Sequence, residues 1–508
     1  MTAQNNTPKQ WLVGSPNASV DTQKKVHYDK VQLKLPSNDW TLIILFLLSL
    51  SAVGLQFYPM ALLSLGLLIY AFVHDRYSFL LMTMIIGTSE GFLPAHALHG
   101  IHTYDLVLLA SIFGLFFYKK NLLVKKCMCL IGLYALYLLG MATLSDETLA
   151  IQFLTIRQYL SIFVMILPLW IFANKEFDIQ LLYRKALGFF LVICAFYVID
   201  GFILQGWVLL PGTYNWGEAP SSITHLLWNP LGTWMPRKYP SGCFIIIIAT
   251  FPLAKYYKLK WWQWGLVVLA LAAMRTFSVI AAFIITLGIF QGKAKKMLLY
   301  GLIVVASMTV LYSVDAATGR HLRIASSIDQ FTNLNAAVDE EDLAEFGTGR
   351  MAQVIPKWEA LVEQNCQWQG FGFIHPTKTT LPRYQINNAL YVDIQLSDEA
   401  AAAVEVTQFN TIINIGIIGL IIQALFFAAL WLLVRRNPNA PFYLSTLLIA
   451  SIMGLAGFTG LNSQNGLFWV ATALGAVLLT SQERDSYNTV ISSQQTSIES
   501  EKYANNNN

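Results

Sequence analysis

Long runs of apolar residues recur along most of this chain, and short polar segments separate them. Runs of roughly 15–25 residues without strand-like alternation are typical of membrane helices, because a water-soluble core does not absorb so many of them. Backbone groups in hydrocarbon must form their hydrogen bonds within the segment, so each run is predicted to be a helix. The predicted spans are Trp40–Phe57, Pro59–Val73, Tyr77–Leu93, Tyr104–Tyr118, Cys127–Leu144, Gln158–Ala173, Ala186–Leu209, Ser241–Ala254, Trp261–Met274, Thr276–Phe290, Met297–Tyr312, Gln408–Val434, Pro441–Gly460 and Gly466–Thr480.

This pattern predicts an all-α polytopic membrane protein with about 12–14 transmembrane helices, because several runs are shorter than the roughly 20 residues of a perpendicular span. Composition agrees: 55% of the 508 residues are hydrophobic and only 12% are charged, whereas soluble chains carry about twice that charge. A mean hydropathy of +0.51 excludes a soluble enzyme, a disordered protein and a secreted disulfide scaffold.

Basic clusters orient the predicted spans, because Lys and Arg accumulate in cytoplasmic loops. The clusters fall on one side if Trp261–Met274 and Thr276–Phe290 are two short helices that turn near Arg275. The side of the membrane opposite to the basic clusters is named here the trans side. One long helix over residues 261–290 would place Lys293–Lys296 on this trans side. The clusters are Lys24–Lys34, Lys119–Lys126, Lys175–Lys185, Lys255–Lys260, Lys293–Lys296 and Arg435–Arg436.

The two-helix interpretation predicts that both termini are cytoplasmic and divides the chain into five parts. Residues 1–39 form a polar N-terminal tail, residues 40–312 a helix bundle, and residues 313–407 a long trans loop. Residues 408–480 form the C-terminal spans, and residues 481–508 are a Ser/Gln/Asn-rich tail that reads as disordered.

Basic residues on the trans side are few, and four of them lie in or beside short trans loops: Arg157, Arg237, Lys238 and Arg275. Arg275 lies between two strongly apolar stretches, where an ionisable residue tends to face a polar cavity; the alternative is an arginine that reaches the headgroups. Arg237 and Lys238 precede a predicted helix start, which suits phosphate oxygens, or they form an ordinary interfacial pair. Arg157 has no basic neighbour, which favours the ordinary interpretation.

The long loop contains a predicted amphipathic helix, Met351–Glu363, with Val354, Trp358 and Leu361 on one face. Arg350 precedes this helix, and a Gly-Phe-Gly-Phe turn at residues 370–373 follows it.

Two titratable residues of the loop are candidates for proton transfer. Glu405 lies at the trans mouth of the span Gln408–Val434, where partial burial would make it a better base; the alternative is a solvated acid. His375 is a candidate proton carrier or ligand. No metal-binding spacing is found, and neither a metal nor another cofactor is expected.

The order of these features resembles the O-antigen ligase and Wzy-type polymerase superfamily of bacterial inner membranes. The resemblance covers roughly residues 150–435: an Arg at a helix turn, one long loop, Gly347-Thr348-Gly349-Arg350, the Gly-Phe-Gly turn, and Gly416-Ile-Ile-Gly419 on the next helix. In that family the periplasmic loop commonly ends with a His-Asn pair about eleven residues before the Gly-x-x-Gly pair, and here Glu405-Val406 stands at that place.

The resemblance implies a polymerase of surface polysaccharide that uses an undecaprenyl-pyrophosphate-linked glycan and inverts the anomeric centre. Glu405 and Arg275 would be catalytic, although Met274 replaces the family's serine before the arginine. Arg237, Lys238, Arg350, His375 and Arg157 would bind substrate. Expected partners are membrane lipid and a chain-length regulator protein, and nucleic acid is not one. A ligase that passes glycan to lipid A core or protein, a lipid-linked oligosaccharide flippase and a non-catalytic scaffold remain alternatives.

Overall fold

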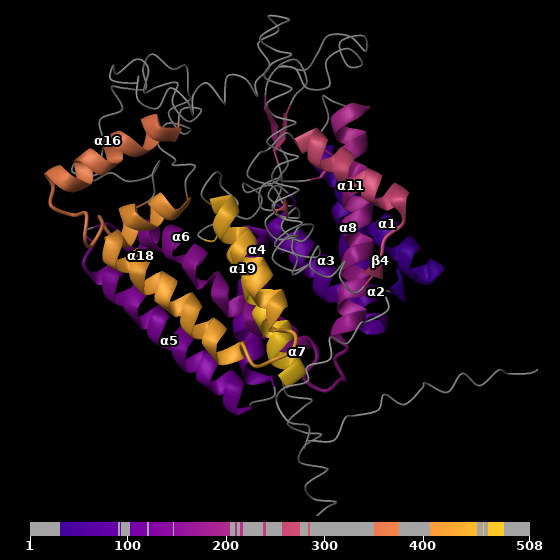
Figure 1. Ribbon diagram of the computed structural model, residues 1–508, viewed down its shortest axis with the longest axis horizontal. Coiled ribbons are helices and arrows are strands. Elements are labelled where there is room, and N and C mark those ends of the chain that lie inside the picture. The colour runs from indigo at the N-terminus through magenta and orange to yellow at the C-terminus, as the bar shows by residue number, and fades with distance from the viewer. Residues whose placement is uncertain are drawn as a thin grey trace, which may run out of the picture.

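The computed structural model describes a helical bundle in which two short strand pairs accompany the helices (Figure 1). Glu405, Arg275, His375 and the predicted spans Ser241–Ala254, Thr276–Phe290 and Met297–Tyr312 lie outside the described residues, apart from residues 283–284. The described residues are 31–89, 92, 102–118, 121–145, 147–203, 209–210, 214–216, 237–239, 257–274, 283–284, 350–374, 407–454, 461 and 466–481.

The helices follow the apolar runs closely. Their bounds are α1 Ser37–Gly54, α2 Met60–His74, α3 Arg76–Thr88, α4 Thr103–Phe113, α5 Leu122–Thr143, α6 Leu149–Leu160, α7 Ile166–Ile171, α8 Ile179–Phe202, α11 Trp261–Met274, α16 Arg350–Glu363, α18 Thr407–Val434 and α19 Ala440–Gly454, with 3-10 turns at Gly114–Phe116 and Ser161–Met165. A last helix covers Gly466–Ser481.

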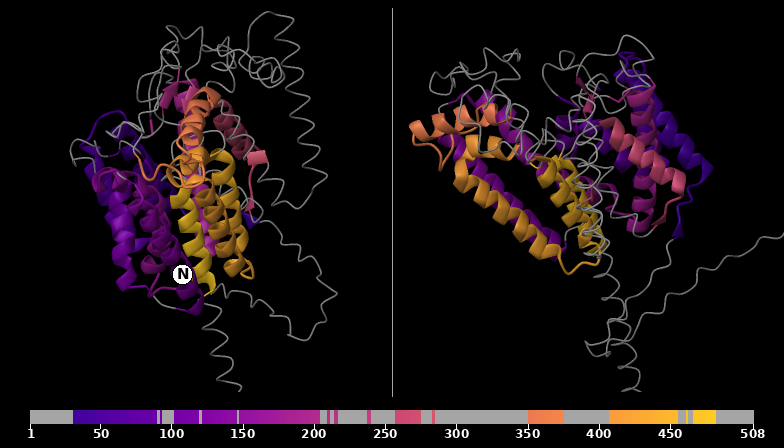
Figure 2. Two further views of the ribbon diagram at one scale, coloured as in Figure 1. Left: turned by 90° about the vertical axis from the view of Figure 1, so that its left-hand side faces the viewer. Right: turned by 45° about the horizontal axis from the view of Figure 1, so that its top comes forward.

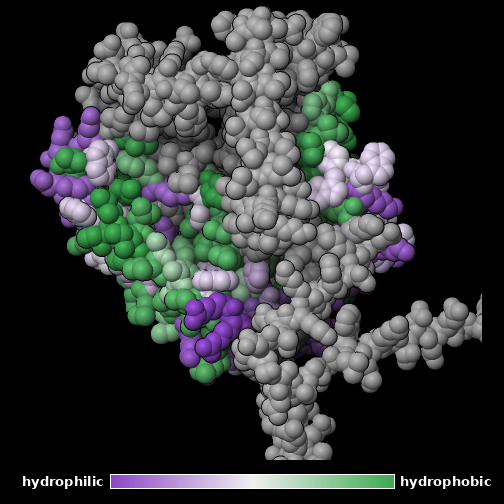
Figure 3. Space-filling view, viewed as in Figure 1, coloured by the Kyte–Doolittle hydropathy of each residue, from purple (hydrophilic) through white to green (hydrophobic). Residues whose placement is uncertain are grey.

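Five of the described helical segments are long and apolar enough to cross a membrane, and this agrees with the predicted class of membrane protein. They are Ser37–Gly54, Leu122–Thr143, Leu149–Ile171, Ile179–Phe202 and Gln408–Val434. Shorter apolar helices pack beside them, as Figure 2 shows from two further directions. Many large apolar side chains on α2, α5 and α18 remain exposed. Figure 3 shows the hydrophobic area on the side of the molecule where α5 and α18 lie. Such a surface is expected where lipid is the solvent.

The last helix, Gly466–Ser481, forms the centre of the core. Almost every one of its residues is buried, including Phe468, and it carries no charged side chain. Close packing depends on glycine: a Cβ at Gly475 would lie 2.2 Å from the Met165 carbonyl oxygen, and one at Gly87 would lie 2.9 Å from the Phe468 ring. These contacts bring α3 and the 3-10 turn before α7 against the same helix.

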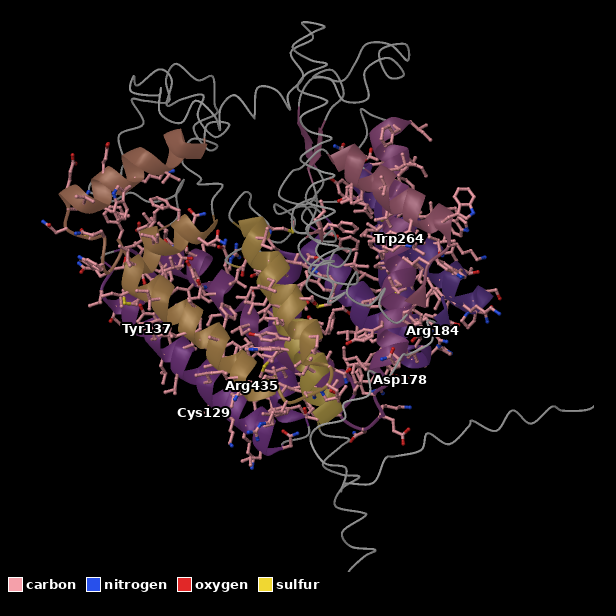
Figure 4. The ribbon with its side chains drawn as sticks, viewed as in Figure 1. Cys129, Tyr137, Asp178, Arg184, Trp264 and Arg435 are labelled. Carbon is pink, nitrogen blue, oxygen red and sulfur yellow. The ribbon has the colours of Figure 1, made fainter. Side chains whose placement is uncertain are left out.

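Several exposed basic residues of the described part of the chain lie at one end of the bundle, named here the basic end. Lys125–Lys126 are exposed at the start of α5, and Arg435–Arg436 are exposed at the end of α18. Figure 4 places Arg435 and Arg184 toward this same end. The strand β1 (Val31–Gln32) pairs in parallel with β4 (Tyr257–Lys258), and the Tyr257 hydroxyl donates to the Gln180 carbonyl at 2.8 Å. The chain preceding α1 therefore meets the chain preceding α11 at the start of α8.

A buried lysine joins three helices at the basic end. Lys185 of α8 is 5% exposed, and its Nζ lies 2.7 Å from Asp39 Oδ1 and 2.6 Å from Asp75 Oδ2. Asp39 belongs to the first turn of α1, and Asp75 is the N-cap of α3, accepting from the Ser78 N–H. The sequence analysis placed Lys185 in a loop before a span at Ala186, which is wrong because α8 begins at Ile179. The carboxylates of Asp39 and Asp75 compensate the positive charge of Lys185, so α8 can contain this buried lysine within its length.

The predicted start of the span Gln158–Ala173 is also wrong. The helix begins at Leu149, so Arg157 lies within a membrane-length helical segment rather than in a short trans loop. Polar residues interrupt the apolar run here, and partners inside the protein pair their donor groups, although the buried Gln152 Oε1 accepts no hydrogen bond from the described residues. Gln152 Nε2 donates to the Glu147 carbonyl at 2.7 Å, and Arg157 forms an ion pair with Asp105. Tertiary partners therefore extend the helix beyond its apolar residues.

Candidate functional site at the break in helix α18

The helix α18 is broken at Gly416, near its trans end. Gly416 has φ 70° and ψ −177°, a backbone conformation that is essentially restricted to glycine. A break of this kind leaves carbonyls before it and N–H groups after it without helical partners. In a membrane helix those groups need other partners, because lipid offers none.

The segment that follows α16 supplies those partners. The N–H groups of Phe371 and Gly372 donate to the carbonyls of Ile413 and Asn414 at 2.7 and 3.0 Å, on the first side of the break. On the second side, the N–H groups of Ile417 and Ile418 donate to the carbonyls of Gln367 and Trp368 at 3.0 and 3.2 Å. Residues 367–372 are named here the docking segment. Its backbone groups form the hydrogen bonds that the broken helix lacks on both sides of Gly416.

Glycine permits this close approach at three positions. A Cβ at Gly416 would lie 2.1 Å from the Trp368 carbonyl oxygen, and one at Gly370 would lie 2.6 Å from the Asn414 carbonyl carbon. Gly370 and Gly372 both have positive φ, 75° and 85°, as the sequence predicted for a tight turn. At Gly372 the close neighbour is Ser145, so the direct contact joins Gly370 of the Gly-Phe-Gly turn to Gly416, the first glycine of the Gly-x-x-Gly pair.

The helix α6 contacts the two residues that directly follow the docking segment, Phe373 and Ile374. Thr155 Oγ1 donates to the Ile374 carbonyl at 3.1 Å, and the Tyr159 ring meets the Phe373 ring edge-on at 5.6 Å between centroids. Asn414 Nδ2 donates to the Tyr159 hydroxyl at 3.2 Å. A buried polar contact thus joins α6 and α18 beside the break.

Arg157 lies on α6 but pairs with another helix. Its Nη1 lies 2.9 Å from Asp105 Oδ2, its Nε donates to the Leu154 carbonyl, and its guanidinium carbon lies 5.0 Å from the Tyr104 ring centroid. Both members of the ion pair are largely buried, with 12% and 14% of their side chains exposed. Asp105 also caps α4 by accepting from the His102 N–H at 2.9 Å. This pairing accounts for the arginine as a brace between α4 and α6 without a bound ligand.

The amphipathic helix α16 packs on the first half of α18. Leu361 is fully buried against Phe409 and Ile413, with Val354 beside them, while Trp358 lies at the edge of the contact. The helix covers Arg350–Glu363, so the predicted amphipathic helix is confirmed and Arg350 is its first residue.

Lys357 is a candidate residue that the sequence analysis missed. It is only 3% exposed, and burial lowers the pKa of its ammonium group to about 8. Its spacing was informative: Lys357 lies three residues after Val354 and four before Leu361, on the face predicted to be buried. A charge on the apolar face of an otherwise amphipathic helix is the signal that distinguishes Lys357 from the other basic residues of the long loop.

The remaining described candidates lie elsewhere in the bundle. Arg237 and Lys238 belong to the short strand β3 (Arg237–Tyr239), which pairs antiparallel with β2 (Tyr214–Trp216). This strand contacts α8 and α11, whereas Arg350 opens α16 at the other side of the molecule (Figure 1). The described backbone therefore places Arg237 and Lys238 in a different part of the molecule from Arg350.

Met274, the last described residue before Arg275, ends the helix α11, which packs against the end of α8. A Cβ at Gly201, near the end of α8, would lie 2.5 Å from Ala273 Cβ of α11. Since α8 and α11 both start near β4, the chain reaches Met274 at the trans end of α8.

The chemistry available at this site is electrostatic. Within the described ranges, no group of three His, Cys, Asp or Glu side chains is arranged to hold a metal ion. A buried hydroxyl and an amide, those of Tyr159 and Asn414, are instead the polar groups shown beside the break, and the buried Lys357 ammonium belongs to the neighbouring helix α16. No protein-family model matches the chain, and no curated protein matches it.

Proposed function

We propose that this protein is a membrane-embedded polymerase of surface polysaccharide, which transfers glycan from an undecaprenyl-pyrophosphate donor to a sugar hydroxyl. We further propose that it spans the bacterial inner membrane, with the basic end and both termini in the cytoplasm and the docking segment on the periplasmic side. The positive-inside rule supports this orientation, because the described basic clusters share one end.

One observation carries the proposal. The sequence resembles the superfamily through two separate motifs, the Gly-Phe-Gly turn and Gly416-Ile-Ile-Gly419, and these two motifs interlock at the break in α18. Motifs that meet in space through glycine-dependent contacts are unlike chance matches scattered over a chain. The interlock also anchors the long loop to the membrane helix α18, which begins two residues after Glu405 in the sequence.

The proposed reaction needs a cation and a base. The acceptor hydroxyl oxygen attacks the anomeric carbon, the bond from that carbon to the phosphate oxygen breaks, and undecaprenyl pyrophosphate departs with both bond electrons. Glu405 takes the hydroxyl proton. Arg275 stabilises the departing diphosphate, because a fixed positive charge in a water-poor site is worth more than one in water. Attack opposite to the leaving group inverts the anomeric centre.

Two alternatives give different products. A ligase uses the same donor but passes the glycan to lipid A core or to protein. A transporter is favoured by the broken helix itself, since discontinuous helices are frequent at transporter binding sites. In this protein, however, backbone groups of the docking segment occupy the break on both sides, which leaves fewer free helix ends to bind an ion or a substrate.

The test is elongation in vesicles. Purified protein reconstituted with undecaprenyl-pyrophosphate-linked repeat units should lengthen the lipid-linked glycan without nucleotide sugars. Glu405→Gln and Arg275→Ala should lose elongation at unchanged protein level. Glu359→Gln and Arg436→Ala are matched controls, because both residues are exposed.

Each other outcome has a separate meaning. Transfer only to lipid A core or protein would identify a ligase. Movement of the lipid-linked unit across the bilayer without a new glycosidic bond would identify a transporter. Normal chain lengths with Glu405→Gln and Arg275→Ala would remove both residues from the mechanism.

A further inference from the structure

An exposed apolar stripe runs along α18 below the break. Ile418, Ile421, Leu425 and Leu432 are each at least half exposed, and their spacing of three, four and seven residues places them on one helix face. A face of this kind on a membrane-length helix is suited to acyl chains. The stripe marks the side of α18 that lipid covers once the helix crosses a bilayer.

The stripe continues onto the trans loop. The Ile418 N–H donates to the Trp368 carbonyl at 3.2 Å, so Trp368 lies next to the trans end of the stripe. The Trp368 side chain is 54% exposed. Two exposed apolar side chains, Ile418 of the membrane helix and Trp368 of the docking segment, therefore belong to residues that a backbone hydrogen bond joins.

The helix α16 has three distinct faces. Val354, Lys357 and Leu361 lie on the face against α18. Trp358 and Val362 lie on one flank and are 37% and 43% exposed. The exposed acids Glu359 and Glu363 occupy the face opposite α18. The apolar flank thus lies between a protein contact and an acidic, water-suited face.

The helix is also placed across the bundle rather than along it. Figure 1 and the right-hand view of Figure 2 show α16 lying across the trans end of α18 and α5 and extending past their edge. Beyond that edge are the exposed apolar side chains of α5 and α18. A helix in this position overhangs the region that lipid fills.

We propose that α16 and the docking segment form a membrane-interface anchor, in which Trp358, Val362 and Trp368 contact phospholipid at the boundary between headgroups and acyl chains of the trans leaflet. Tryptophan suits this boundary, because its ring is apolar while its indole N–H donates to polar headgroups. An interfacial helix buries its apolar flank and keeps its acids in water. The anchor goes beyond the proposed function, and depends only on α18 crossing the bilayer.

The first test compares two neighbouring residues. Val362→Cys and Glu363→Cys are introduced into the full chain with its native cysteines changed to serine, spin-labelled, and reconstituted into phosphatidylcholine vesicles. The label at 362 should collide more with oxygen, which concentrates in lipid, and the label at 363 more with a water-soluble nickel chelate. Equal nickel accessibility at both positions would overturn the anchor. A label at 362 that neither probe reaches would also overturn it, because protein would then cover the flank.

A second measurement keeps the native cysteines. Vesicles whose phosphatidylcholine carries bromine close to the headgroup should quench Trp358 and Trp368. Trp358→Phe and Trp368→Phe should therefore each reduce the quenched part of the fluorescence. Trp469→Phe is the control, because Trp469 is 5% exposed and lies in the core helix; it should reduce only the unquenched part. If Trp358→Phe and Trp368→Phe instead reduce the part of the fluorescence that bromine does not quench, the two tryptophans do not contact lipid and the proposal is contradicted.

Discussion

Replacing Gly416 with alanine should release the docking segment from α18. The conformation at φ 70° and ψ −177° costs a non-glycine residue on the order of 1–3 kcal/mol. The added Cβ would also lie 2.1 Å from the Trp368 carbonyl oxygen and 2.5 Å from the Gln369 nitrogen. These are backbone atoms, so the segment must move. Two hydrogen bonds, from Ile417 and Ile418, then weaken at about 1 kcal/mol each.

The expected sum is at least about 3 kcal/mol against the docked state. Hydrogen–deuterium exchange measures this locally, because exchange of the amides at 371–372 and 417–418 requires the docking segment to open. A loss of about 3 kcal/mol corresponds to exchange roughly a hundredfold faster in peptides that contain these amides. Peptides from the last helix should be unchanged, since the perturbation is local.

Gly132→Ala is the matched control. Gly132 belongs to α5 beside α18, and a Cβ there meets no atom within 4 Å, so exchange should remain as in the parent protein. If Gly416→Ala leaves peptides 366–374 and 413–420 as protected as Gly132→Ala does, the interlock does not stabilise the break, and the argument for the site loses its basis.

Three further predictions concern polar residues. Lys185→Met should lower the unfolding temperature in detergent, because it leaves the buried carboxylates of Asp39 and Asp75 without their cation, at a cost of about 3–5 kcal/mol. The double variant Lys185→Met/Asp75→Asn should regain part of the lost unfolding temperature. If it regains none, the three residues do not stabilise the protein as an ion triad. Thr155→Val should speed exchange of the peptide containing Ile374 several-fold by removing a hydrogen bond worth about 1 kcal/mol, whereas Thr143→Val, whose hydroxyl bonds within its own helix, should not. Burial lowers the pKa of Lys357 from 10.5 to about 8, so the unfolded state binds more protons between these values and stability should rise with pH there, by about 2 kcal/mol from pH 8 to 9.5. Thermal unfolding of the parent and Lys357→Met at several pH values checks this, and parallel curves would refute it.

Continuous apolar runs alone predicted most of the described helices. The run Trp261–Met274 has the bounds of α11, and Gln408–Val434 differs from α18 by one residue. The amphipathic face of α16 was also readable, because its apolar residues repeat at helical spacing. These properties are local: each depends on residues within a few turns of one another. Glycine turn chemistry singled out the Gly-Phe-Gly turn and the family resemblance singled out the Gly-x-x-Gly pair, but neither predicted that the two motifs meet.

Only the tertiary structure decided how the polar residues inside those helices are satisfied. Arg157 interrupts an apolar run, and its partner Asp105 lies 52 residues earlier in the chain. Lys185 depends on Asp75, 110 residues away, and the break at Gly416 depends on a loop segment more than forty residues before it. Burying a charge or a broken helix end is tolerated when a partner is present and costly when it is absent. An apolar run or an amphipathic pattern therefore locates a helix. The residues at which the helix ends or breaks, and the charges that it can bury, depend on which distant residues lie beside it.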